Sequence, residues 1–190
     1  MATGDTVKQE PRRPATPLAE GAMIDDRYKI VRELGRGGMG EVWSGQHSAT
    51  GTPVAVKVLR QSLRGHSKLI TAFRNEVRQV AKLEHPGIVM VLDYGAVSSE
   101  TEQASGGELM AGSPFLAMEY ASAGALDKAL ERVSWSALRT IMLSMLEALA
   151  HAHARGVLHR DIKPANVLLA GIDDFRPGIK LTDFGIAQAV

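Results

Sequence analysis

The sequence predicts an α+β fold in which a small antiparallel sheet comes first and the main helices follow. Residues 28–58 contain three short runs of alternating or β-branched apolar residues, separated by glycines and turn-forming residues, which is typical of antiparallel strands. Residues 67–84 and 136–155 instead place apolar side chains three or four positions apart, which is typical of helices. Two further strand-like runs, at 88–94 and 115–119, lie between the predicted helices.

Composition excludes several classes of protein. The chain has 190 residues, of which 45% are hydrophobic, a net charge of +1 and no cysteine. The small net charge argues against a nucleic-acid-binding protein that relies on bulk electrostatics, and the lack of cysteine excludes disulfides, thiolate zinc sites and cysteine nucleophiles. The first 20 residues show no export signal, and the most apolar stretch, 141–146, is far shorter than the ~20 residues that span a bilayer. We therefore expect a cytoplasmic chain without a membrane segment.

The N-terminal elements follow from local turn chemistry. Residues 1–23 carry prolines at every third position among small and charged residues, so we predict a flexible tail, with a polyproline II ligand as the alternative. A strand begins at residue 28, and two more, at 42–47 and 54–59, flank a Thr-Gly-Thr-Pro turn at 50–53. The three strands are expected to form an antiparallel meander.

The later elements are an insertion and a long helix. Residues 97–113 are rich in Ser, Gly, Glu and Ala and are long for a hairpin connection, so they are expected to be a mobile insertion. The helix at 136–155 can be capped by Ser134 or Ser136 and ended by Gly156. Its periodicity predicts a buried face formed by Leu138, Ile141, Met142, Met145, Leu146, Leu149 and His153.

A glycine-rich turn is the first motif that points to chemistry. Gly35, Gly37 and Gly40 would let backbone amides approach phosphates closely. A dinucleotide-binding turn would open a helix here, and a Walker A loop would have lysine where Glu41 stands, but a strand-like run follows Gly40. The pattern therefore favours a glycine flap between two antiparallel strands, with a glycine-rich hairpin that binds no ligand as the alternative.

A lysine and a glutamate in apolar surroundings form the second motif. Lys57 ends the run Val-Ala-Val-Lys inside a predicted strand, and Glu76 lies on the apolar stripe of the following helix. Burying either charge alone is costly, so each needs a partner of opposite sign. We predict that Lys57 and Glu76 pair; a lysine that reaches solvent from an edge strand is the alternative.

Two short segments near the C-terminal end carry the remaining polar groups. In the run His-Arg-Asp-Ile-Lys-Pro-Ala-Asn, Asp161, Lys163 and Asn166 offer a carboxylate, a cation and an amide oxygen. Asp183 opens the run Asp-Phe-Gly directly after a predicted strand at 179–181. An acid to orient a hydroxyl, a cation for phosphate and oxygens for Mg²⁺ are the groups that phosphoryl transfer requires.

Taken together and in this order, the motifs resemble the signature set of the protein kinases. The run Leu-Gly-Arg-Gly-Gly-Met-Gly-Glu-Val-Trp at 34–43 resembles the bacterial serine/threonine kinases in particular, and Lys163 is typical of serine/threonine rather than tyrosine kinases. The resemblance implies a bilobal kinase-like fold, with a complete β-rich N-lobe and hinge at 24–121 and a partial helical C-lobe at 122–190.

The resemblance also implies which residues bind ATP. Those expected to contact it are Gly35, Gly37 and Gly40 over the phosphates, Lys57, steadied by Glu76, at the α- and β-phosphates, and Val42, Ala55 and Leu168 around adenine. Met118 would be the gatekeeper, and Glu119 to Ala121 the hinge that binds adenine through its backbone.

For catalysis, the same resemblance gives Asp161 the role of orienting the protein hydroxyl and Lys163 that of contacting the γ-phosphate. Asn166 and Asp183 would hold Mg²⁺, and Arg160 would mark a kinase regulated by phosphorylation of its activation loop. The expected reaction is ATP- and Mg²⁺-dependent transfer of the γ-phosphoryl group to serine or threonine hydroxyls of a protein substrate.

The length sets one expectation against activity. The sequence stops at Val190, before the activation loop and most of the helical lobe that the family carries. We therefore expect a fragment of low activity, whose missing portion is lost or supplied by another chain, and an apolar helix face at 138–149 that is partly exposed. The alternative is a catalytically silent nucleotide-binding or interaction module derived from a kinase.

Overall fold

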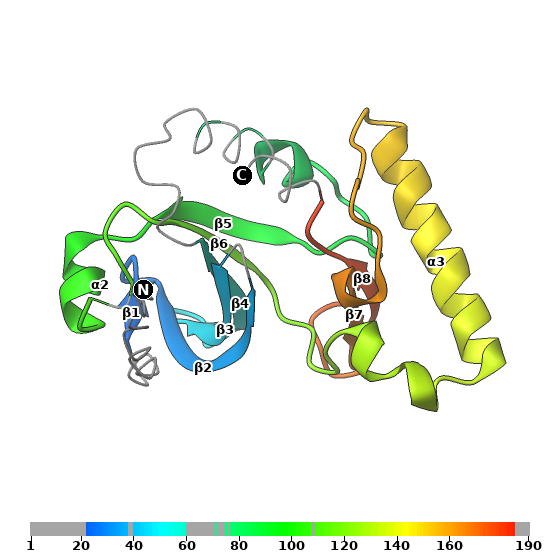
Figure 1. The fold of residues 1–190 in the computed structure, drawn as a ribbon, viewed down its shortest axis with the longest axis horizontal. Helices are drawn as coiled ribbons and strands as arrows, with labels where there is room; N and C mark the ends of the chain where they lie inside the picture. The colour runs from blue at the N-terminus through cyan, green and yellow to red at the C-terminus, as the bar shows by residue number, and fades with distance from the viewer. Residues whose placement is uncertain are drawn as a thin grey trace, which may run out of the picture.

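The computed structural model describes residues 22–37, 40–59, 71, 75, 77–107 and 109–184. The first part of the chain, which ends at Glu119, consists mostly of one antiparallel sheet with the strand order β1-β2-β3-β4-β6-β5 (Figure 1). Its strands are β1 (Met23–Ile24), β2 (Tyr28–Gly37), β3 (Gly40–His47), β4 (Pro53–Leu59), β5 (Val91–Ala96) and β6 (Pro114–Glu119). The α+β fold class and the predicted meander, now β2 to β4, are both confirmed.

One face of the sheet is packed by apolar side chains from several strands. Along β2, Tyr28 and Ile30 are buried while Lys29 and Val31 are exposed, which is the alternation that the sequence showed. Trp43 of β3 is also buried in this core. The central strands β4 and β6 are buried on both faces, because a second apolar cluster that includes Ala55, Leu116 and Met118 packs on the other face of the sheet.

The segment predicted as a mobile insertion, 97–113, contains a helix that the sequence analysis did not predict. Helix α2 (Ser99–Ala104) forms there, and the Ser98 side chain caps it by accepting a hydrogen bond from the Thr101 N–H at 3.1 Å. Thr101 Oγ1 donates to the carbonyl oxygen of Met23 at 2.9 Å, and Val97 packs in the core of the sheet. A helix of six residues is too short for periodicity to reveal, so sequence reasoning missed it.

The N-terminal boundary also differs from the sequence prediction. The predicted tail ended at residue 23, but Ala22 accepts a hydrogen bond from the Ile30 N–H at 2.9 Å, and β1 begins at Met23. The rest of the tail, 1–21, lies outside the described residues. Two-residue strands give no pattern in a sequence, which explains why β1 was missed.

The second part of the chain consists of one long helix, three single turns of 3₁₀ helix and a two-stranded sheet (Figure 1). These elements are α3 (Trp135–His153), η2 (Leu126–Lys128), η3 (Leu130–Arg132), η4 (Pro164–Asn166), β7 (Val167–Ala170) and β8 (Gly178–Leu181). The predicted caps of α3 are present: Ser134 accepts from the Ala137 N–H at 3.2 Å, and Gly156 has a φ of 73°. Within the described part of the chain, no helix is long and apolar enough to cross a membrane.

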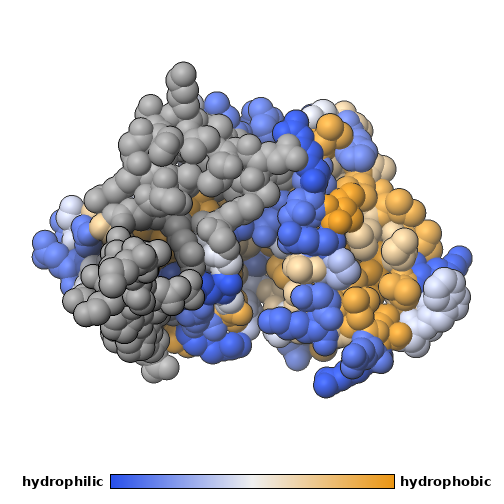
Figure 2. All heavy atoms as spheres, in the orientation of Figure 1, coloured by the Kyte–Doolittle hydropathy of each residue, from blue (hydrophilic) through white to orange (hydrophobic). Residues whose placement is uncertain are grey.

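Helix α3 buries less of its apolar surface than its periodicity predicts. Ile141, Ala148 and Ala152 are buried against β7 and β8, but Met142 and Leu146 are 51% and 58% exposed. The prediction of a buried face was therefore wrong for Met142, Leu146 and the exposed His153, whereas the expected partial exposure is confirmed. Figure 2 shows apolar side chains gathered over the part of the surface where α3 lies.

Backbone hydrogen bonds join the two parts. The Val89 N–H donates to Leu181 O at 2.9 Å, and the Leu181 N–H donates to Gly87 O at 2.8 Å, so β8 continues along the segment that precedes β5. Of the predicted helix 67–84, residues 71, 75 and 77–80 are helical, whereas 81–84 form a turn and an irregular segment, so the helix ends earlier than predicted. Residues 67–70, 72–74 and 76 of this predicted helix lie outside the described part of the chain.

Candidate active site

An apolar cavity of about 360 Å³ lies where the sheet meets the second part. Five of its lining residues were predicted either to surround adenine or to belong to the gatekeeper and hinge: Val42, Ala55, Met118, Ala121 and Leu168. They come from β3, β4, β6, the segment after β6, and β7. A concave, mostly apolar site with a few polar groups at one end is typical of a binding pocket for a small molecule.

Next to this cavity is a second one of about 400 Å³, which we call the polar cavity because more charged side chains line it. Gly35, Val42, Lys57 and Asp183 line both cavities, so the two are continuous. The other predicted groups that line the second cavity are Gly37, Gly40, Asp161, Lys163 and Asn166. Residues that are up to 148 positions apart in the sequence therefore converge on one site.

Lys57 pairs with the carboxylate of Asp183, a partner that the sequence analysis did not predict. Its Nζ lies 2.5 Å from Asp183 Oδ1, and the lysine side chain is buried in the middle of β4. Glu76, its predicted partner, lies outside the described residues. The pair brings the cation of β4 to the start of the Asp-Phe-Gly run, so one charge neutralises the other at the junction of the two cavities.

Asp161 is the acceptor of a small hydrogen-bond network. Lys163 Nζ donates to Asp161 Oδ2 at 2.8 Å, and Asn166 Nδ2 donates to the same oxygen at 2.9 Å. These two bonds, that from Lys163 first, lower the pKa of Asp161. Asp161 is therefore a carboxylate at neutral pH, and both bonds to side chains leave its Oδ1 for another donor.

A backbone turn presents this network to the cavity. Arg160 adopts a φ of 62°, and Pro164 begins η4, so the chain cannot continue as a helix between them. The Asn166 side chain also donates to Asp161 O at 2.8 Å, and the Thr182 N–H donates to Asn166 O at 3.0 Å. The two polar segments that the sequence analysis singled out are thus bonded to each other.

His159 and Phe184 support the site from below. Both side chains are almost fully buried, and their rings are 4.5 Å apart between centroids. Burial lowers the pKa of His159, so the ring is neutral at pH 7. Asp183, directly before Phe184, has a φ of 59°, which turns its carboxylate towards Lys57. Sequence reasoning gave no role to His159, because its packing against residue 184 is a contact across 25 positions.

The donor set fits Mg²⁺. Asn166 leaves its amide oxygen, and Asp183 its second carboxylate oxygen, on the wall of the polar cavity. Mg²⁺ prefers oxygen ligands and is usually held by one or two carboxylates together with substrate phosphates and water. In the described part of the chain, no group of three or more His, Cys, Asp or Glu side chains could hold a metal by itself.

The three predicted glycines have different local reasons. A Cβ at Gly40 would lie 2.1 Å from the carbonyl oxygen of Val58, so β3 and β4 could not pair at this point with any other residue. A Cβ at Gly35 or Gly37 would meet nothing within 4 Å. Gly40 is therefore required by the sheet, while Gly35 and Gly37 lie open over the polar cavity.

Comparison with known protein families identifies the family of this chain. Residues 28–190 match the protein kinase domain. The chain belongs to the protein kinase family. It is 40% identical to the serine/threonine-protein kinase PknA of Mycobacterium tuberculosis over 174 residues, and 35% identical to the serine/threonine-protein kinase Pkn1 of Myxococcus xanthus over 162 residues.

A solved structure supports the same family assignment. The PknI kinase domain of M. tuberculosis matches the kinase chain with a TM-score of 0.67 at 32% identity, over 90% of this chain and 64% of the PknI chain. The kinase chain spans 37% of the length of PknA and 22% of that of Pkn1. The resemblance inferred from the motifs is therefore confirmed for the family and for the fold.

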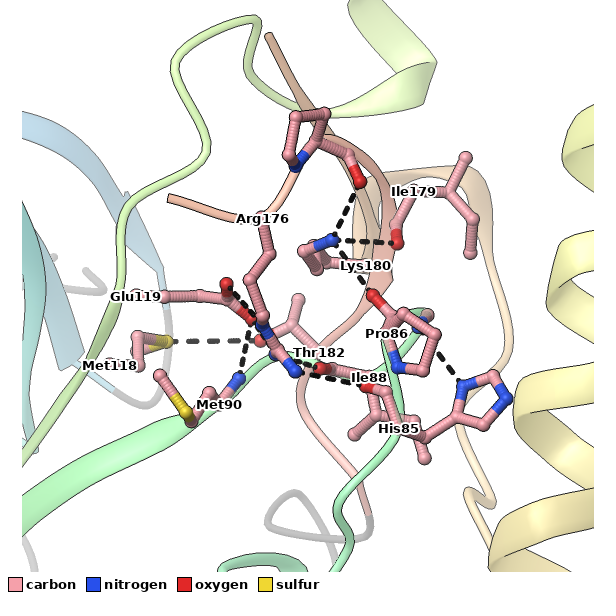
Figure 3. A network of polar contacts seen from close by, with 12 residues as sticks. His85, Pro86, Ile88, Met90, Met118, Glu119, Arg176, Ile179, Lys180 and Thr182 are labelled. Carbon is pink, nitrogen blue, oxygen red and sulfur yellow. Dashed lines mark hydrogen bonds and ion pairs between the residues drawn. The ribbon is translucent and has the colours of Figure 1, made fainter. Parts of the chain in front are cut away.

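Sequence reasoning missed a set of buried polar residues behind the site. Glu119, Arg176 and Lys180 form a network with backbone carbonyls of residues 85–88, on the side of β6 away from the apolar cavity (Figure 3). Glu119, which the sequence analysis predicted to be part of the hinge, does not line that cavity with its side chain. The only signal for these residues was charge inside apolar runs, as in Gly-Ile-Lys-Leu at 178–181.

Proposed function

We propose that this chain holds the nucleotide site and catalytic loop of an ATP- and Mg²⁺-dependent serine/threonine protein kinase. The observation that carries the proposal is the convergence of Lys57, Asp161, Lys163, Asn166 and Asp183 on one polar cavity beside an apolar one. Phosphoryl transfer depends on positioning and electrostatic stabilisation more than on covalent chemistry, and this set supplies both.

Each residue has a task that follows from its position. The apolar walls Val42, Ala55 and Leu168 would hold adenine. Lys57 would lie at the phosphates, with Gly35, Gly37 and Gly40 above them. Asp161 Oδ1 is free to accept a hydrogen bond from a serine or threonine hydroxyl, while Lys163 faces the γ-phosphate. Mg²⁺, when bound, would neutralise the charge that develops on the transferred phosphoryl group.

The second candidate function is nucleotide binding without efficient transfer. It is favoured by the pair between Lys57 and Asp183, because that pair engages both the phosphate-binding cation and a metal ligand and must separate before transfer. We therefore expect little phosphorylation by the chain alone. Under either function, we propose that the chain acts with a protein substrate, lies in the cytoplasm and has no nucleic-acid partner.

Nucleotide titrations and phosphorylation assays test the proposal together. We expect the chain to bind Mg-ATP, Lys57→Met to weaken binding about tenfold or more, and Asp161→Asn to keep binding while lowering any transfer by about 10²-fold or more. Absence of Mg-ATP binding by the unmodified chain would contradict the nucleotide site. Robust transfer that survives either substitution would contradict the assigned roles, and robust transfer abolished by both would exclude the silent module.

A further inference from the structure

The turn between β7 and β8, residues 171–177, lies against the segment that follows β6. Its two large apolar side chains, Ile172 and Phe175, are 84% and 73% exposed, so apolar packing does not hold it there. What joins it to the segment is a set of polar contacts from Asp174 and Arg176. Further along the segment, Ala123 and Gly124 are bonded to Leu169 of β7 through their backbones, so Asp174 and Arg176 add contacts at the start of the segment, at residues 119 and 122.

Arg176 binds the buried carboxylate of Glu119. Its Nε donates to Glu119 Oε2 at 3.0 Å and its Nη2 to Oε1, while Nη2 also donates to Ile88 O at 2.8 Å (Figure 3). The Met90 N–H donates to Glu119 Oε1 at 2.7 Å. Glu119 is 4% exposed, so its charge depends on Arg176 for compensation.

Asp174 binds the same segment three residues further on. Its Oδ2 accepts from the Ser122 N–H at 2.8 Å and from the Gly171 N–H at 2.6 Å. Burial raises the pKa of Asp174, but the N–H donors of Ser122 and Gly171 outweigh it, and the pKa is lowered. A Cβ at Gly171 would lie 2.8 Å from Ser122 Oγ, which shows how closely the turn approaches the segment.

The residues held in this way form one wall of the apolar cavity. Met118, Tyr120, Ala121 and Ser122 line it, while the Glu119 side chain points to the opposite side, as expected for alternation at the end of a strand. Fixing Glu119 from behind and the Ser122 backbone from the side therefore fixes the backbone between them, which faces the cavity.

We propose that Asp174 and Arg176 are positioning residues for the nucleotide, because they hold segment 119–122 in the conformation that binds adenine. The proposal rests on the proposed function, since it needs a nucleotide in the apolar cavity. Neither residue touches that cavity, and both act through the backbone of the segment. Loss of either contact lets the segment move and lowers the affinity for ATP without changing the groups that carry out transfer.

Asp174 offers a test with a matched control next to it. Asp173 lies in the same turn and is exposed. We expect Asp174→Ala to raise the Kd for Mg-ATP about 3- to 10-fold, Asp174→Asn to raise it less because the amide oxygen still accepts, and Asp173→Ala to leave it unchanged. The Kd is measured by calorimetry well below the unfolding temperature, with the unfolding free energy of each variant from urea denaturation.

Arg176 provides a second and independent test. Arg176→Met leaves the Glu119 carboxylate buried without its cation, whereas Arg176→Lys keeps a charge at the same place. We expect the methionine variant to show a larger rise in Kd than the lysine variant, and in any kinase assay a higher KM for ATP with kcat unchanged. Arg139, exposed on α3, gives the matched control Arg139→Met.

The outcomes separate this inference from the proposed function. If the unmodified chain binds no Mg-ATP, both are overturned. If it binds, but Asp174→Ala has the same Kd as Asp173→Ala and Arg176→Met the same as Arg139→Met, only the positioning role is overturned. A loss of unfolding free energy with unchanged Kd also overturns it, because a purely structural role predicts that result.

Discussion

Single buried polar side chains define the interior of this kinase chain as much as its apolar ones do. Lys180 is fully buried, and its Nζ donates to Pro86 O at 2.8 Å and to Pro177 O at 3.3 Å. Burial lowers the pKa of Lys180. A cation bonded to carbonyl oxygens in an apolar interior is satisfied in one geometry only, so Lys180 fixes the position of β8 relative to the loop at 85–88.

At the same scale, His85 is expected to make stability depend on pH. Its Nδ1 accepts a hydrogen bond from the Gly87 N–H at 3.0 Å, and the His151 ring lies 5.0 Å away between centroids. Burial first, and then the neighbouring His151, lower the pKa of His85, while Glu147 opposes this shift. Protonation of Nδ1 would also abolish the bond from Gly87.

The sign of the effect follows from this lowered pKa. Below the unfolded-state pKa of ~6.5, the unfolded chain binds more protons at His85 than the native chain does, so the free energy of unfolding falls as pH falls. We expect a loss of stability from pH 7 to pH 5 that is smaller in His85→Asn, whose amide oxygen can still accept from Gly87. Urea denaturation at each pH measures it, with the exposed His153→Asn as control; equal slopes in both variants would contradict the prediction.

At the scale of elements, the glycines of β2 and β3 that flank the turn between these strands serve two different purposes. Gly40 is forced by its approach to Val58 O, so Gly40→Ala is expected to lower the free energy of unfolding by about 1–3 kcal/mol. Gly35 and Gly37 have open space, so alanine there should change stability by less than about 0.5 kcal/mol. If phosphates lie beneath the turn, those two variants should still weaken Mg-ATP binding several-fold.

Denaturation and nucleotide titration on the same three alanine variants measure both effects. The prediction requires the two properties to separate: stability falls at Gly40, and affinity falls at Gly35 and Gly37. If Gly35→Ala and Gly37→Ala bind Mg-ATP as the unmodified chain does, the turn does not cover phosphates. If Gly40→Ala is as stable as the unmodified chain, the close approach of β3 to β4 is not required.

The elements also show what a sequence can and cannot predict. The meander and the site motifs were predictable because turn chemistry and strand alternation are local, and because Lys57, Asp161 and Asp183 stand in unusual surroundings. Helix α2 was missed because it is short and because what stabilises it, Thr101 bonded to Met23, is a contact across the chain. Arg176 was missed for the same reason, since its partner lies 57 positions away.

At the scale of the whole molecule, the kinase chain consists of a sheet and a smaller helical part, with the two cavities at their junction (Figure 1). Both parts contribute to each cavity, since β3 and β4 supply one side and the residues around η4, β7 and Asp183 supply the other. Nucleotide affinity is therefore a property of how the parts are joined. The junction is made by the hydrogen bonds of Leu181 to 87–89 and by the β7–β8 turn.

The uncovered face of α3 exposes several large apolar side chains, and apolar residues gather over this part of the surface (Figure 2). Trp135, Met142, Leu143 and Leu146 are all exposed there. Contiguous apolar patches of this kind promote association because burying them removes apolar area from water. We expect two copies of the chain to associate through α3, and the associated fraction to rise with the concentration of the chain.

Charge placed on this face should prevent that association without unfolding the chain. Met142→Glu with Leu146→Glu is expected to shift the chain to monomer and to change the free energy of unfolding by less than about 0.5 kcal/mol per substitution, because both side chains are largely exposed. Sedimentation velocity over a concentration series measures the association. Thr140→Glu adds charge at an exposed polar position of the same helix and should leave the association in place. An unmodified chain that stays monomeric throughout, or equal association in the double variant and the control, would show that α3 does not mediate it.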